Sequence, residues 1–347
     1  MLTVRARHLV AGTVAGVAAT AVFAGTALAD TPQKPVTRLA GGDRVATAVA
    51  ISKQAFPTDH SAHNVVLTAA YRFPDAMSAA PLGKDLTAPL LLTTPGELSP
   101  ATLTEIQRVL PAPTSGSAGT TTDGCTSTPP ANAVYIIGGD AAIAQEIDSQ
   151  LNQAGFDVVR VAGADRFATS VAVAQCEGSP STVFLARGDN FADALASGPA
   201  AASVNGTVLL TAGSTMPPSV SAYLSGLSSP TVYAVGQAAH KADPSAQAIV
   251  GGDRFATAAL VADEFFPSPT VVGVATGWNF PDALAGGAFM GLEGGPVLMT
   301  RPETLQSADG LYIGEHHATL QQAFLFGGPA SLSPIIDQQV SVALNQN

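Results

Sequence analysis

An aspartate followed directly by an arginine, after a turn of small residues, occurs three times in this 347-residue chain. At the start of a helix such a pair can serve two roles, because the unpaired N–H groups and the helix dipole attract either a capping carboxylate or an anion. The carboxylate would compete with an anion for the same N–H groups. We therefore predict that the aspartates are structural and that the arginines face a ligand or a neighbouring module. The pairs are Asp43 with Arg44, Asp165 with Arg166, and Asp253 with Arg254.

A second aspartate recurs further along each copy, in a Phe-x-Asp-Ala block. Proline precedes it in two copies, which is typical of the first turn of a helix, where the dipole favours a carboxylate. We interpret these aspartates as structural too. Exposed residues just before the block would suit a sugar polymer through ring stacking and hydrogen bonds, although burial of the tryptophan between modules is an equal alternative. The aspartates are Asp75, Asp193 and Asp282, and the candidate polymer contacts are Arg72, Asn190, Asn279 and Trp278.

Paired acids also suggest a glycosidase, which places two carboxyl groups on either side of the scissile bond. Because the same acids recur three times in capping positions, we do not expect an enzyme. The histidines lie outside the repeated blocks, and the chain has neither a His-Glu-x-x-His nor a Gly-x-Ser-x-Gly motif. We therefore expect no metal site, no cofactor and no catalytic serine.

The N-terminal segment is excluded from the fold. Arg5 and Arg7 precede a run of small apolar residues that ends in Ala-Leu-Ala, which is typical of a secretory signal peptide over residues 1–29. A membrane anchor is the competing interpretation. No later segment approaches the length of a membrane span, so we expect a soluble, exported chain after cleavage.

Charge argues against a nucleic acid as the partner. The chain has 15 Lys and Arg against 26 Asp and Glu, a net charge of −11, and loss of the signal peptide makes it more negative. A negative field repels polyanions at long range. An anionic partner would have to bind through local positive sites.

The cysteines, Cys125 and Cys176, predict a disulfide, since their number is even and an exported protein meets an oxidising compartment. Cys125 lies in a Pro-, Gly-, Ser- and Thr-rich stretch, 111–132, which lengthens the first repeat relative to the others. The bridge would attach this loop insertion to the second repeat.

Three blocks in the same order, three times, indicate three modules, which we place at 30–155, 156–245 and 246–347. Short aliphatic runs such as VVLT from Val65 predict buried strands, and Ser-Pro openings such as the one at Ser99 predict helix starts. The alternation predicts an α/β fold in which each module is a doubly wound parallel sheet. The strand-to-helix turns then lie at the carboxyl edge, where such sheets bind ligands.

The blocks resemble the type 2 cell wall-binding repeat, which occurs in tandem threes in secreted proteins of Gram-positive bacteria. The resemblance rests on RVAGADRFATSVAVA from Arg160, GWNFPDALAGG from Gly277 and VYIIGGDAAI from Val134. It implies Rossmann-like modules in a pseudo-threefold arrangement that hold a wall-associated protein non-covalently on an anionic polymer, either a teichoic-type polymer or an acidic polysaccharide. Phosphates or carboxylates of that polymer would meet the three arginines of the Asp-Arg turns.

Several departures from the repeat pattern argue against three equivalent polymer sites. Ala248 stands where the other repeats have Arg38 and Arg160, Gln237 replaces a glycine of the third block, and the last helix of the middle repeat is predicted to be short. In addition, Ala192 replaces the proline of the Phe-x-Asp-Ala block, and Arg72 replaces the usual asparagine before it.

The repeats also bear on the kind of protein. Because the third repeat runs to the end of the chain, we expect no separate effector domain such as an amidase. The alternative to wall attachment is an extracellular scaffold, adhesin or sensor that binds another protein; a wall hydrolase is a third interpretation.

Overall fold

The computed structural model describes residues 33–72, 74–111, 118–122, 125 and 130–346. The signal peptide predicted for residues 1–29 lies outside them. Lys34–Asn347 form one compact unit, and the description below refers to this unit. Within the described residues, every helix is too short or too polar to cross a membrane.

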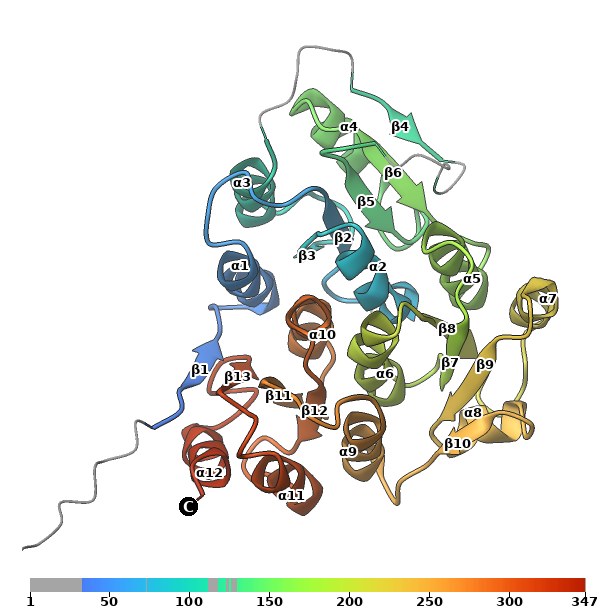
Figure 1. The fold of residues 1–347 in the computed structure, drawn as a ribbon. Coiled ribbons are helices and arrows are strands. Elements are labelled where there is room, and N and C mark those ends of the chain that lie inside the picture. The colour runs from blue at the N-terminus through green and yellow to red at the C-terminus, as the bar shows by residue number, and fades with distance from the viewer. Residues whose placement is uncertain (1–32, 73, 112–117, 123–124, 126–129, 347) are drawn as a thin grey trace, which may run out of the picture. The chain divides into compact units, whose positions relative to one another are not determined.

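The unit contains three parallel sheets with a common strand order, as the sequence predicts (Figure 1). The strands are almost uninterrupted aliphatic runs, because helices cover both faces of a parallel sheet. The first sheet consists of β3 (Leu90–Thr93), β2 (Val65–Ala69), β5 (Val134–Ile137), β6 (Val158–Val161) and β4 (Thr120–Thr121). The second consists of β8 (Thr207–Thr211), β7 (Thr182–Arg187), β9 (Thr231–Val235) and β10 (Gln247–Ile249). The third consists of β12 (Val297–Thr300), β11 (Val271–Thr276), β13 (Gln322–Phe326) and β1 (Val36–Leu39).

Helices alternate with these strands. Those that open on Ser-Pro begin at the proline, as predicted, because proline fixes a helical φ where no N–H partner is needed. The helices after the Asp-Arg turns are α1 (Arg44–Ala55), α5 (Arg166–Cys176) and α9 (Arg254–Phe265). Those of the Phe-x-Asp-Ala blocks are η1 (Pro74–Ser78) with α2 (Ala79–Asp85), α6 (Ala192–Ser203) and α10 (Pro281–Glu293). The others are α3 (Pro100–Val109), α4 (Gln145–Gln153), α7 (Pro218–Gly226), α8 (Gln237–Ala242), α11 (Ser307–Glu315) and α12 (Pro334–Leu344).

The sheets are shifted from the sequence repeats by one strand. The strand before each Asp-Arg turn pairs with the sheet of the preceding repeat: β6 with β5, β10 with β9, and β1 with β13, where Val36 lies opposite Ala323. The helix after the turn then packs on the next sheet, α1 on β3, α5 on β8 and α9 on β12. The boundaries predicted at 155/156 and 245/246 follow the sequence period, whereas the hydrogen bonds join each repeat to its neighbour.

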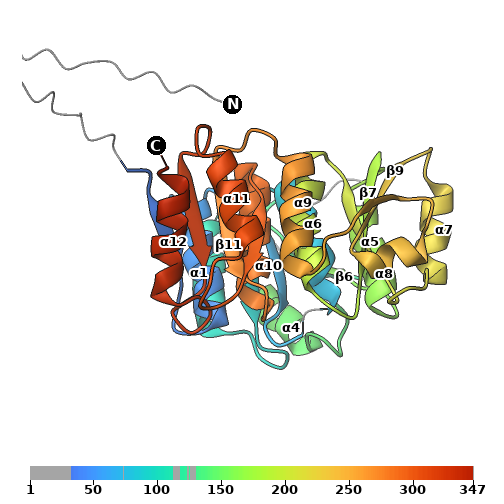
Figure 2. The same ribbon diagram turned by 90° about the horizontal axis from the view of Figure 1, so that it is seen from below.

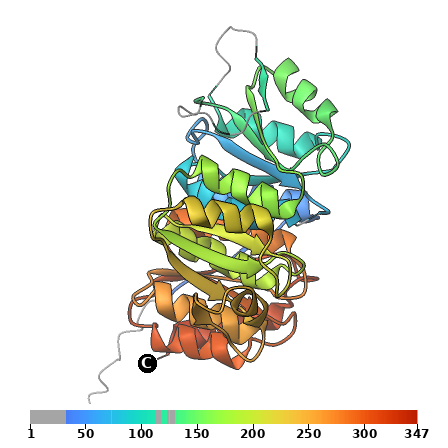
Figure 3. The same ribbon diagram turned by 90° about the vertical axis from the view of Figure 1, so that its right-hand side faces the viewer.

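The helices α2, α6 and α10 contact one another pairwise in the middle of the unit, and the three sheets lie around them (Figure 1). Figure 2 views the unit from below, and Figure 3 views it from the side of α7 and α8. Small residues allow the close approach, since a methyl group at Gly198 would come within 2.8 Å of the Ala80 Cβ. The pseudo-threefold arrangement is thus centred on contacts between alanine and glycine residues of these three helices.

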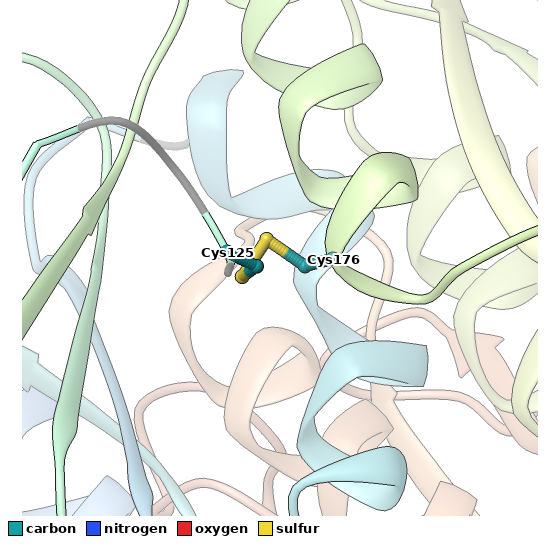
Figure 4. Close-up of a disulfide and its surroundings, with 2 residues drawn as sticks. All are labelled: Cys125 and Cys176. Carbon is teal, nitrogen blue, oxygen red and sulfur yellow. A yellow bond between two sulfur atoms is a disulfide. The ribbon is translucent and has the colours of Figure 1, made fainter. Parts of the chain in front are cut away.

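Cys125 and Cys176 form the predicted disulfide, with a sequence separation of 51 (Figure 4). Cys176 is the last residue of α5, so the bridge joins the insertion to the second repeat. Part of the insertion is ordered as β4, which pairs with β6. Residues 112–117, 123–124 and 126–129 of the insertion lie outside the described residues.

Removal of the disulfide should lower thermal stability. A loop of 51 residues gives at most about 4 kcal/mol in the chain-entropy model, because the bridge restricts the unfolded chain. We expect the double variant C125S/C176S to melt at a lower temperature than the oxidised protein and to be insensitive to dithiothreitol. Equal melting temperatures for the oxidised, reduced and variant proteins would contradict this assignment.

Candidate functional site

Each Asp-Arg turn is built by local contacts. The Asp43 carboxylate accepts a hydrogen bond from the Ala46 N–H at 2.8 Å and caps α1, and a side chain at Gly41 would collide with Ala46. The hydroxyl of Thr47 accepts the Gly41 N–H at 3.1 Å, which closes the turn. Asp165 and Asp253 cap α5 and α9 in the same way. No ligand is therefore needed to explain the turn itself.

The arginine of each turn reaches the end of the next β-strand. One guanidinium nitrogen donates to the carbonyl oxygen just beyond that strand, at 2.8 Å from Arg44 to Ala70. The same bond joins Arg166 to Gly188 at 2.8 Å and Arg254 to Gly277 at 2.7 Å. All three arginines are half-buried. Because a guanidinium has five N–H donors, this bond leaves donors for a ligand at each turn.

The arginines also lie where repeats meet. The guanidinium of Arg44, in the first repeat, is 5.8 Å from the ring centre of Phe280, in the third. The guanidinium of Arg254, in the third repeat, is 5.5 Å from the ring centre of Phe191, in the second. Each of these two arginines thus joins a main-chain carbonyl of its own repeat to an aromatic ring of the preceding one.

The aspartates of the second block approach a glycine of the third block. Gly138, Gly236 and Gly327 have φ values of 118°, 82° and 112°, which favour glycine. A Cβ at Gly236 or Gly327 would also collide with the carboxylate of Asp193 or Asp282. The glycines are therefore required both by the backbone and by the carboxyl groups beside them.

Burial raises the pKa of each of these carboxyl groups, and that of Asp193 rises to about 6. Hydrogen bonds oppose the effect, from Thr169 to Asp75 and from Ser331 to Asp282, the latter at 2.8 Å. The charge of Arg166 also lowers the pKa of Asp75. Because Thr169 belongs to the next repeat, the Asp75 carboxyl group holds two repeats together.

Two crevices open at these junctions, at the carboxyl edge of the first and third sheets. Each lies between the two strands at which the order of the sheet reverses, β2 with β5 and β11 with β13, which is where open α/β sheets bind ligands. Their volumes are about 520 Å³ and 190 Å³. The larger is lined by Tyr71, Arg72, Asp75, Ala142, Asp165 and Arg166, among others. The smaller is lined by Asp43, Arg44, Asn279, Asp282, Gly328 and Ser331, among others.

The junction at the second sheet is built differently. In the first sheet, the buried guanidinium of Arg160 pairs with Asp148 of α4 and donates to the carbonyl of Gly138 at 2.9 Å. Arg38 likewise pairs with Asp337 of α12 and donates to Gly327.

At the second sheet the corresponding helix is the short α8, which has no aspartate and begins directly after Gly236. Ala248 is exposed, and α8 offers no aspartate to pair with an arginine at this position, unlike α4 and α12. The departures at Gln237 and Ala248 and the short α8 therefore all lie at the junction of the second sheet.

Some of the predicted polymer contacts line the two crevices and others do not. Arg44, Arg72, Arg166 and Asn279 line the crevices. Asn190 is half-buried beside the start of α6, and Trp278 is 55% exposed rather than buried between modules.

Tyr71, which is 58% exposed and lines the larger crevice, was not among the predicted contacts. Its position in the block is the same as that of Trp278, and this alignment could have found it.

Three linked parallel sheets with crevices at the repeat junctions define a tandem-repeat α/β fold. The chain belongs to the family Cell wall binding domain 2 (CWB2), whose model matches residues 38–148, 160–242 and 248–337.

Two curated relatives come from Bacillus subtilis (strain 168). The chain is 27% identical to N-acetylmuramoyl-L-alanine amidase LytC over 92% of this chain and 60% of the relative. It is 25% identical to the Amidase enhancer over 88% of this chain and 40% of the relative. The chain thus spans less than two thirds of either protein.

Two solved structures from Clostridium difficile share the fold. Cwp6 matches with a TM-score of 0.78 and 23% identity, over 91% of this chain and 48% of that one. Cwp8 matches with a TM-score of 0.75 and 23% identity, over 89% of this chain and 52% of that one.

The buried carboxyl groups should make the protein more stable in mild acid. A folded-state pKa above the unfolded value favours the protonated form in the fold, so stability is full below the unfolded pKa and falls as pH rises through the folded one. For Asp193 the window runs from 3.8 to about 6 and corresponds to at most about 3 kcal/mol. We expect D193N to flatten the dependence of the free energy of unfolding on pH between 4 and 7, measured by urea denaturation.

Asp189 supplies the control, because Arg187 holds the pKa of this exposed carboxyl group below its usual value. D189N should leave the decline between pH 4 and 7 in place. An unchanged pH profile in D193N would contradict the proposed burial of the Asp193 charge.

Proposed function

We propose that this chain is a non-catalytic protein that attaches non-covalently to the cell wall, outside the cell, by binding an anionic wall polymer. The observation that carries the proposal is the arginine-bearing turn at each repeat junction, beside the carboxyl-edge crevices, in a chain of the cell wall binding family. The polymer is of the teichoic type or an acidic polysaccharide.

Guanidinium groups, rather than the net charge of the crevices, support an anionic ligand, since each crevice is lined by at least as many aspartates as arginines. The larger crevice is lined by Arg72 and Arg166, and the smaller by Arg44. Guanidinium groups bind phosphates and carboxylates through two parallel hydrogen bonds. Because the net charge of the chain is −11, attraction has to come from these few groups, and several weak contacts along one polymer would add through avidity.

The acids of the site support binding rather than catalysis. Asp43 and Asp165 cap helices, while Asp75 and Asp282 are hydrogen-bonded to neighbouring side chains. A glycosidase would need one of them free as a nucleophile or base. The name of one relative describes an amidase, and we propose that the likeness to it reflects wall binding alone.

The bonds from the arginines to main-chain carbonyls favour a second candidate, an extracellular scaffold or adhesin for another protein. In that case the arginines would only join the repeats. A test therefore needs a positive charge in a crevice that is not packed into the fold, and Arg72 is exposed there.

We expect R72A to weaken retention on isolated walls several-fold without a change in melting temperature, because it removes one crevice charge. Lys53, exposed in the last turn of α1, provides a control of equal charge change, and K53A should bind like the wild type. Binding of the wild type should fall between 50 and 500 mM NaCl, because salt screens exposed charges. The measurement is co-sedimentation with walls over a range of protein concentrations.

Walls stripped of phosphodiester polymers and acidic polysaccharides provide the decisive comparison. Retention on stripped walls equal to that on intact walls would refute the proposed ligand. Retention that needs a wall protein but no polymer would establish the scaffold function instead.

A further inference from the structure

Six side chains form an unbroken series of ring and guanidinium contacts across the three repeats. The series runs Tyr71, Arg44, Phe280, Phe191, Arg254, Trp278, with successive separations of 4.5, 5.8, 6.3, 5.5 and 5.6 Å from ring centre to ring centre or guanidinium carbon. The two ends of the series, Tyr71 and Trp278, are 58% and 55% exposed, whereas Phe280 is buried. The series therefore exposes an aromatic ring to solvent at each end, and the arginine next to each ring holds that ring in place.

The two exposed rings are held by the same local construction. Arg44 donates to the carbonyl of Ala70, and the next residue is Tyr71. Arg254 donates to the carbonyl of Gly277, and the next residue is Trp278. In each case the guanidinium that binds the main chain also lies over the following ring, which holds the ring in place without covering it. A single exposed aromatic side chain is common on a protein surface. Two exposed rings that are held by the same contacts at equivalent positions of the repeat indicate a shared role.

The third copy of this position has no ring. The residue after Gly188 is Asp189, whose carboxylate accepts two hydrogen bonds at 2.7 Å from Arg187. The guanidinium of Arg166 donates to Gly188 as its counterparts do. The Asp189 carboxylate beside Arg166 repels an anion. The three copies of this position therefore provide two exposed aromatic rings and not three.

We infer that Tyr71 with Arg44, and Trp278 with Arg254, form two stacking subsites for sugar rings that carry acidic groups. The inference rests on the proposed function and narrows its ligand to a polymer built from pyranose rings with carboxylate or phosphate groups, rather than a ring-free polyol phosphate. The apolar face of a pyranose covers an aromatic ring, which offers a large, rigid, partly polar surface. The guanidinium beside that ring then meets the acidic group.

Neighbouring residues complete the polar rim of each subsite. Arg72 is exposed next to Tyr71, and Asn279 is exposed next to Trp278. The side-chain oxygen of Asn279 accepts the Phe280 N–H at 3.0 Å, which directs its NH₂ group away from that bond. Both residues thus offer hydrogen-bond donors to hydroxyl groups at the rim of a stacked ring.

Trp278 is the only tryptophan in the chain, so its fluorescence reports directly on one subsite. We expect a saturable change in emission when the full protein is titrated with a uronic acid-containing oligosaccharide, and none with polyglycerol phosphate of equal charge. Y71A and W278A should each weaken binding of the oligosaccharide at least fivefold by calorimetry, and W278F should retain most of it. Leu311, an exposed residue of α11 that is 63% accessible, provides the control, and L311A should bind normally.

Equal emission changes with both probes, or wild-type affinity in Y71A/W278A, would overturn the stacking subsites. If that double variant were still retained on intact walls but not on stripped walls, the proposed function would hold and only the stacking subsites would be refuted. If the wild type instead bound stripped walls as well as intact walls, the proposed function itself would be refuted.

Discussion

The pairing of each repeat's first strand with the sheet of the preceding repeat is the constraint on which the rest of the structure depends. Because β6, β10 and β1 each complete a neighbour's sheet, the Asp-Arg turn that follows has to pass from one sheet to the next. That passage brings the arginine to a carbonyl of its own repeat and, for Arg44 and Arg254, to a ring of the preceding one. The crevices exist because sheets are joined there.

The residues that join the repeats beside the crevices also restrict which ligands could enter those crevices. A carboxyl group such as that of Asp282 sits beneath a glycine with positive φ and bonds to Ser331, so the floor of the crevice is acidic but largely desolvated. The positive groups lie at the rim instead. An anion that approached the crevice would meet arginine at the edge and be kept from the floor, so the proposed polymer would lie across the surface rather than within the crevice.

Much of this could be predicted from the sequence, because the information is local and repeated. The strand at Val65, the helix starts at proline and the capping role of the aspartates all follow from neighbouring residues. The partner of β1 could not be predicted, since a repeat shows the order of elements but not which sheet a strand joins. The bond from Arg44 to Ala70 was missed for the same reason, and the platform at Tyr71 with it.

The pairing of β1 with β13 also fixes when the fold can be completed. Val36 pairs with Ala323, so β1 has no partner until β13 has been synthesised. A contact of such long range forms slowly, because its loop-closure entropy is lost before the contact is gained. Until then the third sheet lacks its edge and an unpaired strand is exposed to other chains. Closure of the third sheet therefore waits for β13, however early β1 is made.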